Sequence, residues 1–224
     1  MTDYRTEFID FLIETGALKF GTFTLKSGRV SPYFFNSGSF DTASRLERLG
    51  YFYACRAMEM GAPPTVVFGP AYKGIPLAVA TALALAKHFG VDAGYCFDRK
   101  EAKGHGDKGL LVGKVPTGSD RILMVDDVIT DGLTKVEAIE SMKGATEAPI
   151  TGIVIALNRQ EKTKDGKDPV RSLEETSGVR VGAIATLAEV IAALSDKADG
   201  MKVLDEETKR RIEDYRREYG VETV

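Results

Sequence analysis

One segment, residues 122–135, constrains the fold more than any other part of the chain. Its sequence is ILMVDDVITDGLTK, in which four apolar residues lead directly into the adjacent carboxylates Asp126 and Asp127. A short apolar run bounded by turn residues predicts a buried strand of a parallel sheet. Apolar residues then recur at helical spacing over residues 136–142. The segment therefore predicts a strand, a polar loop and a helix.

The predicted loop carries groups that suit a phosphorylated sugar. In open α/β sheets, ligands bind at the carboxyl ends of the strands, where this loop begins. Residues Thr130 to Thr134 place backbone N–H groups and two hydroxyls at a helix N-terminus, an arrangement that favours phosphate. Asp126 and Asp127 can instead accept hydrogen bonds from sugar hydroxyls. The alternative is that both carboxylates only end the strand and cap the helix, as Asp residues in turns often do.

The bulk properties exclude several classes of protein. The 224 residues suit one α/β domain and can bury a sizeable core. A net charge of −3 argues against general nucleic-acid binding. No apolar run reaches the roughly 20 residues of a membrane span, and the N-terminus has no signal-peptide pattern. The two cysteines, Cys55 and Cys96, lie far apart in apolar segments. We therefore expect buried thiols and a cytoplasmic protein.

Strands alternate with helices along most of the chain, which predicts an α/β fold with a mostly parallel sheet flanked by helices. The expected helices cover residues 3–15, 42–60, 74–90, 132–144, 187–194 and 204–218. The expected strands of this sheet cover residues 65–69, 93–97, 110–115, 121–125, 150–158 and 179–185. Two more strands within residues 19–36 lie outside the alternation. We assign them to a small N-terminal hood, formed mainly by residues 1–40, on a single domain that spans residues 1–224.

Residues 98–109, DRKEAKGHGDKG, form a very polar and cation-rich segment. Such charge runs are usually solvated surface loops. This one has almost no apolar residue to dock it, so we expect a mobile lid loop suited to covering an anionic leaving group. The G-x-G-x-x-G pattern at 104–109 lacks the preceding strand and following helix of a dinucleotide site. We therefore expect no dinucleotide cofactor there.

Other candidate residues lie at turns and strand ends. Lys73 opens a predicted helix, where the helix dipole disfavours a cation, so either an anionic partner or a side chain in water is expected. Phe34 and Phe35 are adjacent in a strand, so one ring faces each side of it. One ring is expected in the core, while the other offers an aromatic surface to a flat ligand. Arg159 follows the strand 150–158 and is either a site residue or a surface arginine.

Residues 122–135 resemble the phosphoribosyl diphosphate (PRPP) signature of the type I phosphoribosyltransferases. That signature consists of an apolar strand, two acidic residues, an apolar pair and a Thr/Gly-rich phosphate loop. Within this family the chain resembles the orotate phosphoribosyltransferases over roughly residues 1–190. The supporting segments, in order, are FTLKSGRVSPYFFN, FGPAYKGIPLA, DRKEAKGHGDKG, VDDVITDGLT and LNRQE.

The resemblance implies a reaction, a cofactor and an assembly. The 5-phosphoribosyl group would pass from PRPP to N1 of orotate in pyrimidine biosynthesis, giving orotidine 5′-phosphate and diphosphate. Mg²⁺ would be held mainly through PRPP and water, with no side chain assigned as a metal ligand. The protein would be a homodimer with shared active sites and no nucleic-acid or membrane partner. Two alternatives are a PRPP-dependent transferase for another base and a non-catalytic PRPP-sensing regulator, although no basic helix-turn-helix segment is found.

The resemblance also implies roles for particular residues. Asp126 and Asp127 would hold the ribose hydroxyls. The residues around orotate would be Lys26, Phe34, Phe35 and Arg159. The residues that handle the diphosphate would be Tyr72, Lys73, Arg99, Lys100, Lys103 and His105, the last two in catalytic roles. The 5-phosphate loop would comprise Thr130, Asp131, Gly132, Leu133 and Thr134. The preceding Val128 and Ile129 would also belong to the substrate-binding residues.

Two loop residues depart from the usual family pattern. Asp131 stands where a small residue is usual, and Leu133 stands where threonine is usual. The acidic side chain and the missing hydroxyl are expected to weaken phosphate binding slightly. Thr134 can replace the hydroxyl, and backbone N–H groups would still contribute most of the binding.

Overall fold

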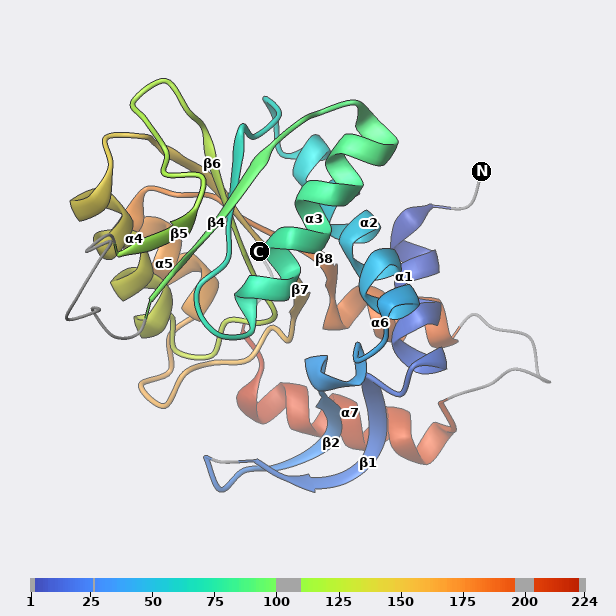
Figure 1. Cartoon of the computed structure of the whole chain (residues 1–224). Coiled ribbons are helices and arrows are strands. Elements are labelled where there is room, and N and C mark those ends of the chain that lie inside the picture. The colour runs from blue at the N-terminus through green and yellow to red at the C-terminus, as the bar shows by residue number, and fades with distance from the viewer. Residues whose placement is uncertain (1–2, 26, 100–109, 196–203, 222–224) are drawn as a thin grey trace.

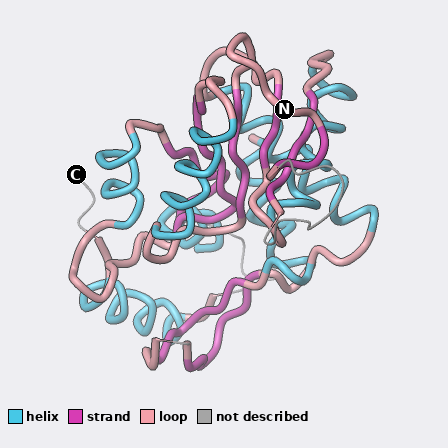
Figure 2. Tube along the Cα trace, turned by 60° about the vertical axis from the view of Figure 1, so that its left-hand side comes forward, coloured by secondary structure: helices cyan, strands magenta, loops and turns pink. Residues whose placement is uncertain are grey.

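The computed structural model of the chain describes residues 3–25, 27–99, 110–195 and 204–221. In these ranges a six-stranded sheet lies between two layers of helices, and a separate two-stranded sheet lies beside it (Figures 1 and 2). The fold class predicted from the sequence is therefore confirmed.

The larger sheet has the strand order β5-β4-β3-β6-β7-β8. Its strands are β3 (Val66–Phe68), β4 (Gly94–Asp98), β5 (Leu111–Gly113), β6 (Ile122–Asp126), β7 (Ile150–Asn158) and β8 (Val181–Thr186). Neighbouring strands pair in parallel, except that β5 runs antiparallel to β4 at the edge. The chain moves outward in one direction after β3 and in the other after β6, so the two central strands flank a topological switch point. Such a point is where open α/β sheets bind ligands.

Alternate residues of the central strands face the two helical layers. Ile122 and Met124 of β6 belong to one apolar cluster, while Leu123 and Val125 belong to the other. This arrangement explains why the strand is apolar throughout rather than alternating with polar residues. Figure 1 shows the two layers on opposite sides of the sheet. One contains α4 (Leu133–Ala145) and α5 (Pro169–Ser177), and the other contains α1 (Tyr4–Glu14), α2 (Ala43–Glu59), α3 (Gly74–Phe89) and α6 (Leu187–Ser195).

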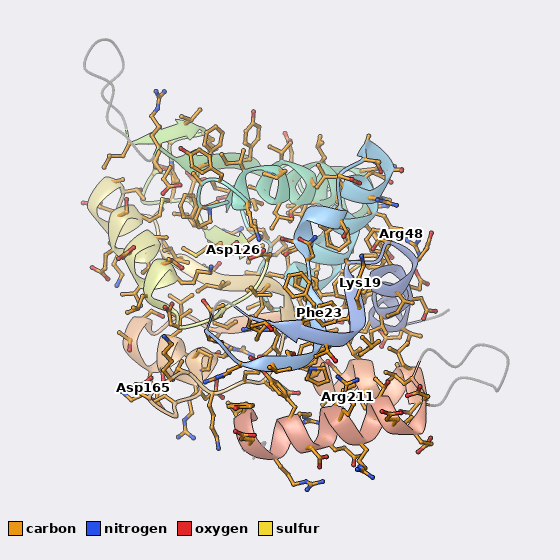
Figure 3. The ribbon with its side chains drawn as sticks, turned by 90° about the horizontal axis from the view of Figure 1, so that it is seen from below. Lys19, Phe23, Arg48, Asp126, Asp165 and Arg211 are labelled. Carbon is orange, nitrogen blue, oxygen red and sulfur yellow. The ribbon has the colours of Figure 1, made fainter. Side chains whose placement is uncertain are left out.

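The two-stranded sheet consists of β1 (Leu18–Thr24) and β2 (Val30–Phe35), which pair antiparallel. Helix α7 (Glu206–Tyr219) packs against it, and the guanidinium of Arg211 donates to the Gly21 carbonyl at 2.8 Å and the Thr22 hydroxyl at 2.7 Å. Figure 3 looks onto this end of the molecule, with Arg211 beside the small sheet. A short 3₁₀ turn, η1 (Ser37–Ser39), then leads back toward the larger sheet.

Most elements lie where the sequence predicted them, within two residues at most ends. Among the described helices, α5 was not predicted, although the sequence carries its signals. The Asp168 side chain accepts from the Val170 and Arg171 N–H groups, Pro169 opens the helix, and Gly178 ends it in a left-handed conformation. No described helix is long and apolar enough to cross a membrane.

The prediction for the cysteines is confirmed, because Cys55 and Cys96 are both buried and free. Burial raises the pKa of the Cys96 thiol to about 12. Each thiol therefore acts as a small apolar group of the core.

Candidate active site

A cavity of about 500 Å³ opens at the carboxyl end of β6, beside the topological switch point. Three segments meet there: the loop between β3 and α3, the end of β4, and the loop that joins β6 to α4. The lining residues that bear on the chemistry are Tyr72, Lys73, Asp98, Arg99, Asp126, Asp127, Thr134 and Lys135. The cavity therefore combines two buried carboxylates with several cations.

Asp127 is held at the base of this cavity by three donors. Lys73 Nζ lies 2.7 Å and the Ser37 hydroxyl 2.6 Å from Oδ2, while the Val128 N–H donates to Oδ1 at 2.9 Å. Burial raises the pKa of the Asp127 carboxyl, but the hydrogen bonds from Lys73 and Ser37 outweigh it and lower the pKa below its usual value. Asp127 is therefore ionised at neutral pH. Of the two alternatives left open for Lys73, an anionic partner or a side chain in water, the structure shows the anionic partner on a largely exposed side chain.

Asp126 points to a different lysine. Its Oδ2 forms an ion pair with Lys135 of α4, and its Oδ1 accepts from the Asp127 N–H at 2.8 Å. The buried Tyr53 hydroxyl donates to the Asp126 carbonyl at 2.7 Å and fixes the end of the strand. Burial raises the pKa of the Asp126 carboxyl, and Lys135 opposes that rise.

The loop between β6 and α4 presents its backbone at the helix N-terminus. Thr130, Asp131, Leu133 and Thr134 are exposed there, and Ile129 is buried beneath them. Gly132, immediately before the helix, has φ of 80°, a left-handed conformation that strains any residue with a Cβ. Exposed N–H groups at a helix N-terminus suit an anion.

Asp131 already occupies part of that anion site. Its Oδ1 accepts the Leu133 N–H at 3.1 Å. A phosphate that used the same N–H would have to displace this carboxylate.

The loop before α3 is held by a carboxylate from the neighbouring strand. Asp98, at the end of β4, accepts the Ala71 N–H at 2.6 Å, and the Ala71–Tyr72 peptide bond is cis. Arg99 follows Asp98, and its buried Nε has no hydrogen-bond partner among the described residues. Arg99 also lines the cavity, so it places a cation beside the two carboxylates.

Of the predicted base-binding residues, Phe34 and Phe35 lie in β2 of the two-stranded sheet. Phe34 is exposed and stacks on Phe23 with ring centroids 5.5 Å apart, while Phe35 packs against the core. The expectation that the two rings face different environments is confirmed. Arg159 follows β7 and lies 3.5 Å from Glu161, a buried carboxylate that also accepts the Tyr33 hydroxyl.

Comparison with known proteins places this site in a family. Residues 50–211 match the family described as the phosphoribosyl transferase domain. An orotate phosphoribosyltransferase from Thioalkalivibrio sulfidiphilus is 50% identical over 221 residues, which cover 99% of this chain and 100% of that protein. The chain belongs to the orotate phosphoribosyltransferase family.

Other relatives agree with this placement. The orotate phosphoribosyltransferase of Colwellia psychrerythraea is 48% identical over 225 residues, covering 99% of this chain and 100% of that protein. The crystal structure of orotate phosphoribosyltransferase from Francisella tularensis superposes with a TM-score of 0.83 at 35% identity, covering 96% of this chain and 100% of that one. The similarity therefore extends over the two-stranded sheet as well as the larger one.

The structure of this phosphoribosyltransferase brings some predicted site residues together and separates others. The cavity gathers Tyr72, Lys73, Arg99, Asp126, Asp127 and Thr134. Phe34 and Arg159 do not line it. Four predicted residues lie outside the described ranges, namely Lys26, Lys100, Lys103 and His105.

The sequence analysis missed several residues that contact the predicted ones. Ser37 donates to Asp127, Asp98 holds the loop before α3, Glu161 pairs with Arg159, and Lys135 pairs with Asp126. The sequence could have indicated a partner for Lys135, because a cation near a helix N-terminus is disfavoured by the helix dipole, as it is for Lys73. No group of three His, Cys, Asp or Glu side chains that could hold a metal occurs in the described part of the chain.

Proposed function

We propose that this enzyme transfers the 5-phosphoribosyl group of PRPP to N1 of orotate, giving orotidine 5′-phosphate and diphosphate. The observation that carries this proposal is the buried pair Asp126–Asp127 at the topological switch point, directly before the exposed residues that open helix α4. This arrangement suits a ribose with a phosphate beside it. Support for orotate as the base comes from the full-length relatives named orotate phosphoribosyltransferase. Such a reaction belongs to pyrimidine biosynthesis.

In this proposal the ribose lies across the carboxylates. Asp126 and Asp127 accept hydrogen bonds from its hydroxyls, and the backbone of residues 130–134 binds the 5-phosphate. Lys73 and Arg99 face the diphosphate. The family resemblance adds Tyr72, Lys100, Lys103 and His105 to the diphosphate side.

The reaction breaks the bond between the sugar C1 and a diphosphate oxygen, and diphosphate leaves. Orotate N1 forms the new bond to C1 and loses its proton, which passes to the diphosphate or to water. The transition state has oxocarbenium-ion character, as in glycoside cleavage. Positive charge then develops on the sugar near two carboxylates, and negative charge develops on the diphosphate near the cations. Fixed groups of this kind stabilise charge because they need no reorganisation during the reaction.

Lys73 can serve both the free and the substrate-bound enzyme. Its side chain is 67% exposed, although its ammonium group is bonded to Asp127 and to the Ser37 hydroxyl at 3.1 Å. A long exposed side chain can turn toward an arriving diphosphate without leaving a buried cation behind. Asp127 then becomes available to the ribose hydroxyls.

Orotate carries a carboxylate and a flat ring. The guanidinium of Arg159 suits the carboxylate, and its Nε has no hydrogen-bond partner among the described residues. The exposed face of Phe34 suits the ring. Phe23 stacks on Phe34 and so supports its ring. The family resemblance also assigns Phe35 and Lys26 to this part of the site.

We propose Mg²⁺ as the cofactor, bound mainly through PRPP oxygens and water. When bound, it neutralises charge on the diphosphate. The oxygen donors at the cavity fit such an ion, because Mg²⁺ prefers carboxylates, substrate phosphates and retained waters. Asp126 and Asp127 would contact it through the ribose or water.

We also propose a cytoplasmic homodimer with shared active sites, a hood formed mainly by residues 1–40, and a lid at residues 98–109. Support for a subunit interface comes from an apolar groove between α2 and α3, lined by Leu46, Val79 and the exposed Leu83. Sedimentation equilibrium of the parent and of Leu83→Asp tests the dimer. A parent that sediments as a monomer contradicts it.

The proposed reaction is tested by following the loss of orotate absorbance with PRPP and Mg²⁺. Parallel reactions replace orotate with uracil, adenine or hypoxanthine. We expect turnover with orotate and none with the other bases. Turnover with another base alone supports a different transferase, and PRPP binding without turnover of any base supports the regulator.

A further inference from the structure

We propose that Lys135 is a positioning residue of the active site, a fixed counter-charge that holds the Asp126 carboxylate against the ribose and ties the phosphate loop to the end of β6. The proposal rests on the function proposed above, because it deepens the role of the same site. The residue belongs to none of the groups that the sequence analysis assigned to substrate.

The first observation is that the ion pair is buried on both sides. The side chains of Lys135 and Asp126 are 10% and 11% exposed, and the Lys135 ammonium contacts Oδ2 of Asp126. The other carboxylate oxygen accepts the Asp127 N–H. Both oxygens of Asp126 therefore have protein donors, which fix the orientation of the carboxylate.

The second observation is the contrast with the neighbouring pair. Lys73 is mostly exposed and can leave Asp127 for water or substrate. Lys135 cannot leave Asp126 without creating an uncompensated buried charge, which is strongly unfavourable. The two lysines therefore act differently: Lys73 can exchange between partners, whereas Lys135 stays in place.

The third observation is where the pair lies in the chain. Asp126 ends β6 and Lys135 lies in the first turn of α4, so the ion pair joins the two ends of the phosphate loop. A cation in the first turn opposes the helix dipole, and the carboxylate compensates for it. Consequently the pair sets the position of the helix N–H groups relative to the two carboxylates. Those are the groups assigned to the 5-phosphate and the ribose.

A double-mutant cycle tests this role. The variants are Lys135→Met, Asp126→Asn, the two together, and the charge-conserving Lys135→Arg. The matched control is Lys143→Met, which removes a half-exposed lysine paired with Glu140 on the same helix. Each variant is measured for PRPP affinity by calorimetry with Mg²⁺, and for kcat and the KM of PRPP and orotate.

We expect Lys135→Met to weaken PRPP binding about tenfold to a hundredfold, in line with the loss of one partner of a buried charge pair. The KM of orotate should change less than that of PRPP. Lys135→Arg should recover most of the loss, and Lys143→Met should match the parent. In the Asp126→Asn background, adding Lys135→Met should cost no further PRPP affinity, because its partner is already neutral.

Additive losses in the cycle would overturn the proposal, because Lys135 would then act on substrate or packing independently of Asp126. Parent-like PRPP binding by Lys135→Met would also overturn it. If Lys135→Met does not fold, Lys135→Gln replaces it both alone and together with Asp126→Asn, because its neutral amide can still donate to Asp126 and the coupling is read in the same way. Failure of the parent to use orotate would contradict the proposed base specificity alone, because the cycle is read from PRPP binding.

Discussion

The phosphate loop contains an acidic residue that competes with its expected ligand. Asp131 accepts the Leu133 N–H, one of the backbone donors at the start of α4. In Asp131→Ala this donor is freed and a negative charge near the phosphate is removed, each worth about 0.5–1 kcal/mol. We expect PRPP to bind about five- to thirtyfold more tightly, the sum of the two contributions. Calorimetry measures this, with Asp131→Asn separating the charge from the hydrogen bond, and weaker binding by Asp131→Ala would contradict the prediction.

For individual residues, the sequence predicted which kinds of group the site would contain better than which residues would contact one another. The position of Lys73 at a helix start left an anionic partner and a solvated side chain as alternatives, and the structure shows the partner. The same argument applied to Lys135 but depended on knowing that its side chain turns inward. The arrangement around Glu161, which pairs with Arg159, could not be predicted. It also involves Tyr33, which donates to the same carboxylate from a strand distant in the sequence.

At the scale of elements, α7 supports the two-stranded sheet through Tyr215, which packs on Tyr33 of β2, and through Arg211, which bonds to β1. Arg211→Met removes the hydrogen bonds to Gly21 and Thr22, so we expect β1 to open more often. A loss of about 1.4 kcal/mol would accelerate amide exchange in β1 roughly tenfold, while the six-stranded sheet should be unchanged. Hydrogen exchange with mass spectrometry measures both, with the exposed neighbour Arg210→Met as control. Equal acceleration in both sheets would show global destabilisation instead.

The elements that the sequence predicted best are those with one dominant signal. Strand β6 is a continuous apolar run because helices cover both of its faces. Helix α5 was missed because its apolar face is short and only its ends carry strong signals. The direction of β5 was also not predictable, since pairing direction at a sheet edge depends on the path of the connection rather than on local composition.

For the whole molecule, Asp120 should make stability depend on pH without affecting catalysis. It lies before β6, at the opposite end of that strand from the cavity, and accepts from Lys114 Nζ and the Thr65 hydroxyl at 2.7 Å each. The Lys114 ammonium and the donors at Thr117 and Thr65 hold the pKa of the Asp120 carboxyl well below its usual value. Its contribution is therefore present above the unfolded-state pKa of about 3.9 and is lost as pH falls through the lower folded-state pKa.

Asp120→Asn should consequently lower the Tm at neutral pH, and the difference from the parent should shrink in strong acid. Thermal unfolding across a pH series measures this difference. The kcat at neutral pH should equal that of the parent. A Tm difference that is constant with pH would contradict the ionised state of Asp120.

The central claim is that the two carboxylates at the end of β6 bind the ribose of PRPP. The most direct measurement is kcat/KM for orotidine 5′-phosphate formation by the parent and by the double variant Asp126→Asn with Asp127→Asn. The amides keep most hydrogen bonds but leave Lys135 without its ionised partner, so the variant is assayed where thermal unfolding shows it folded. There we expect a loss of about 10²- to 10³-fold in kcat/KM. Asp165→Asn, an exposed carboxylate that Figure 3 shows far from Asp126, is the control. A folded double variant with parent-like kcat/KM would contradict the account.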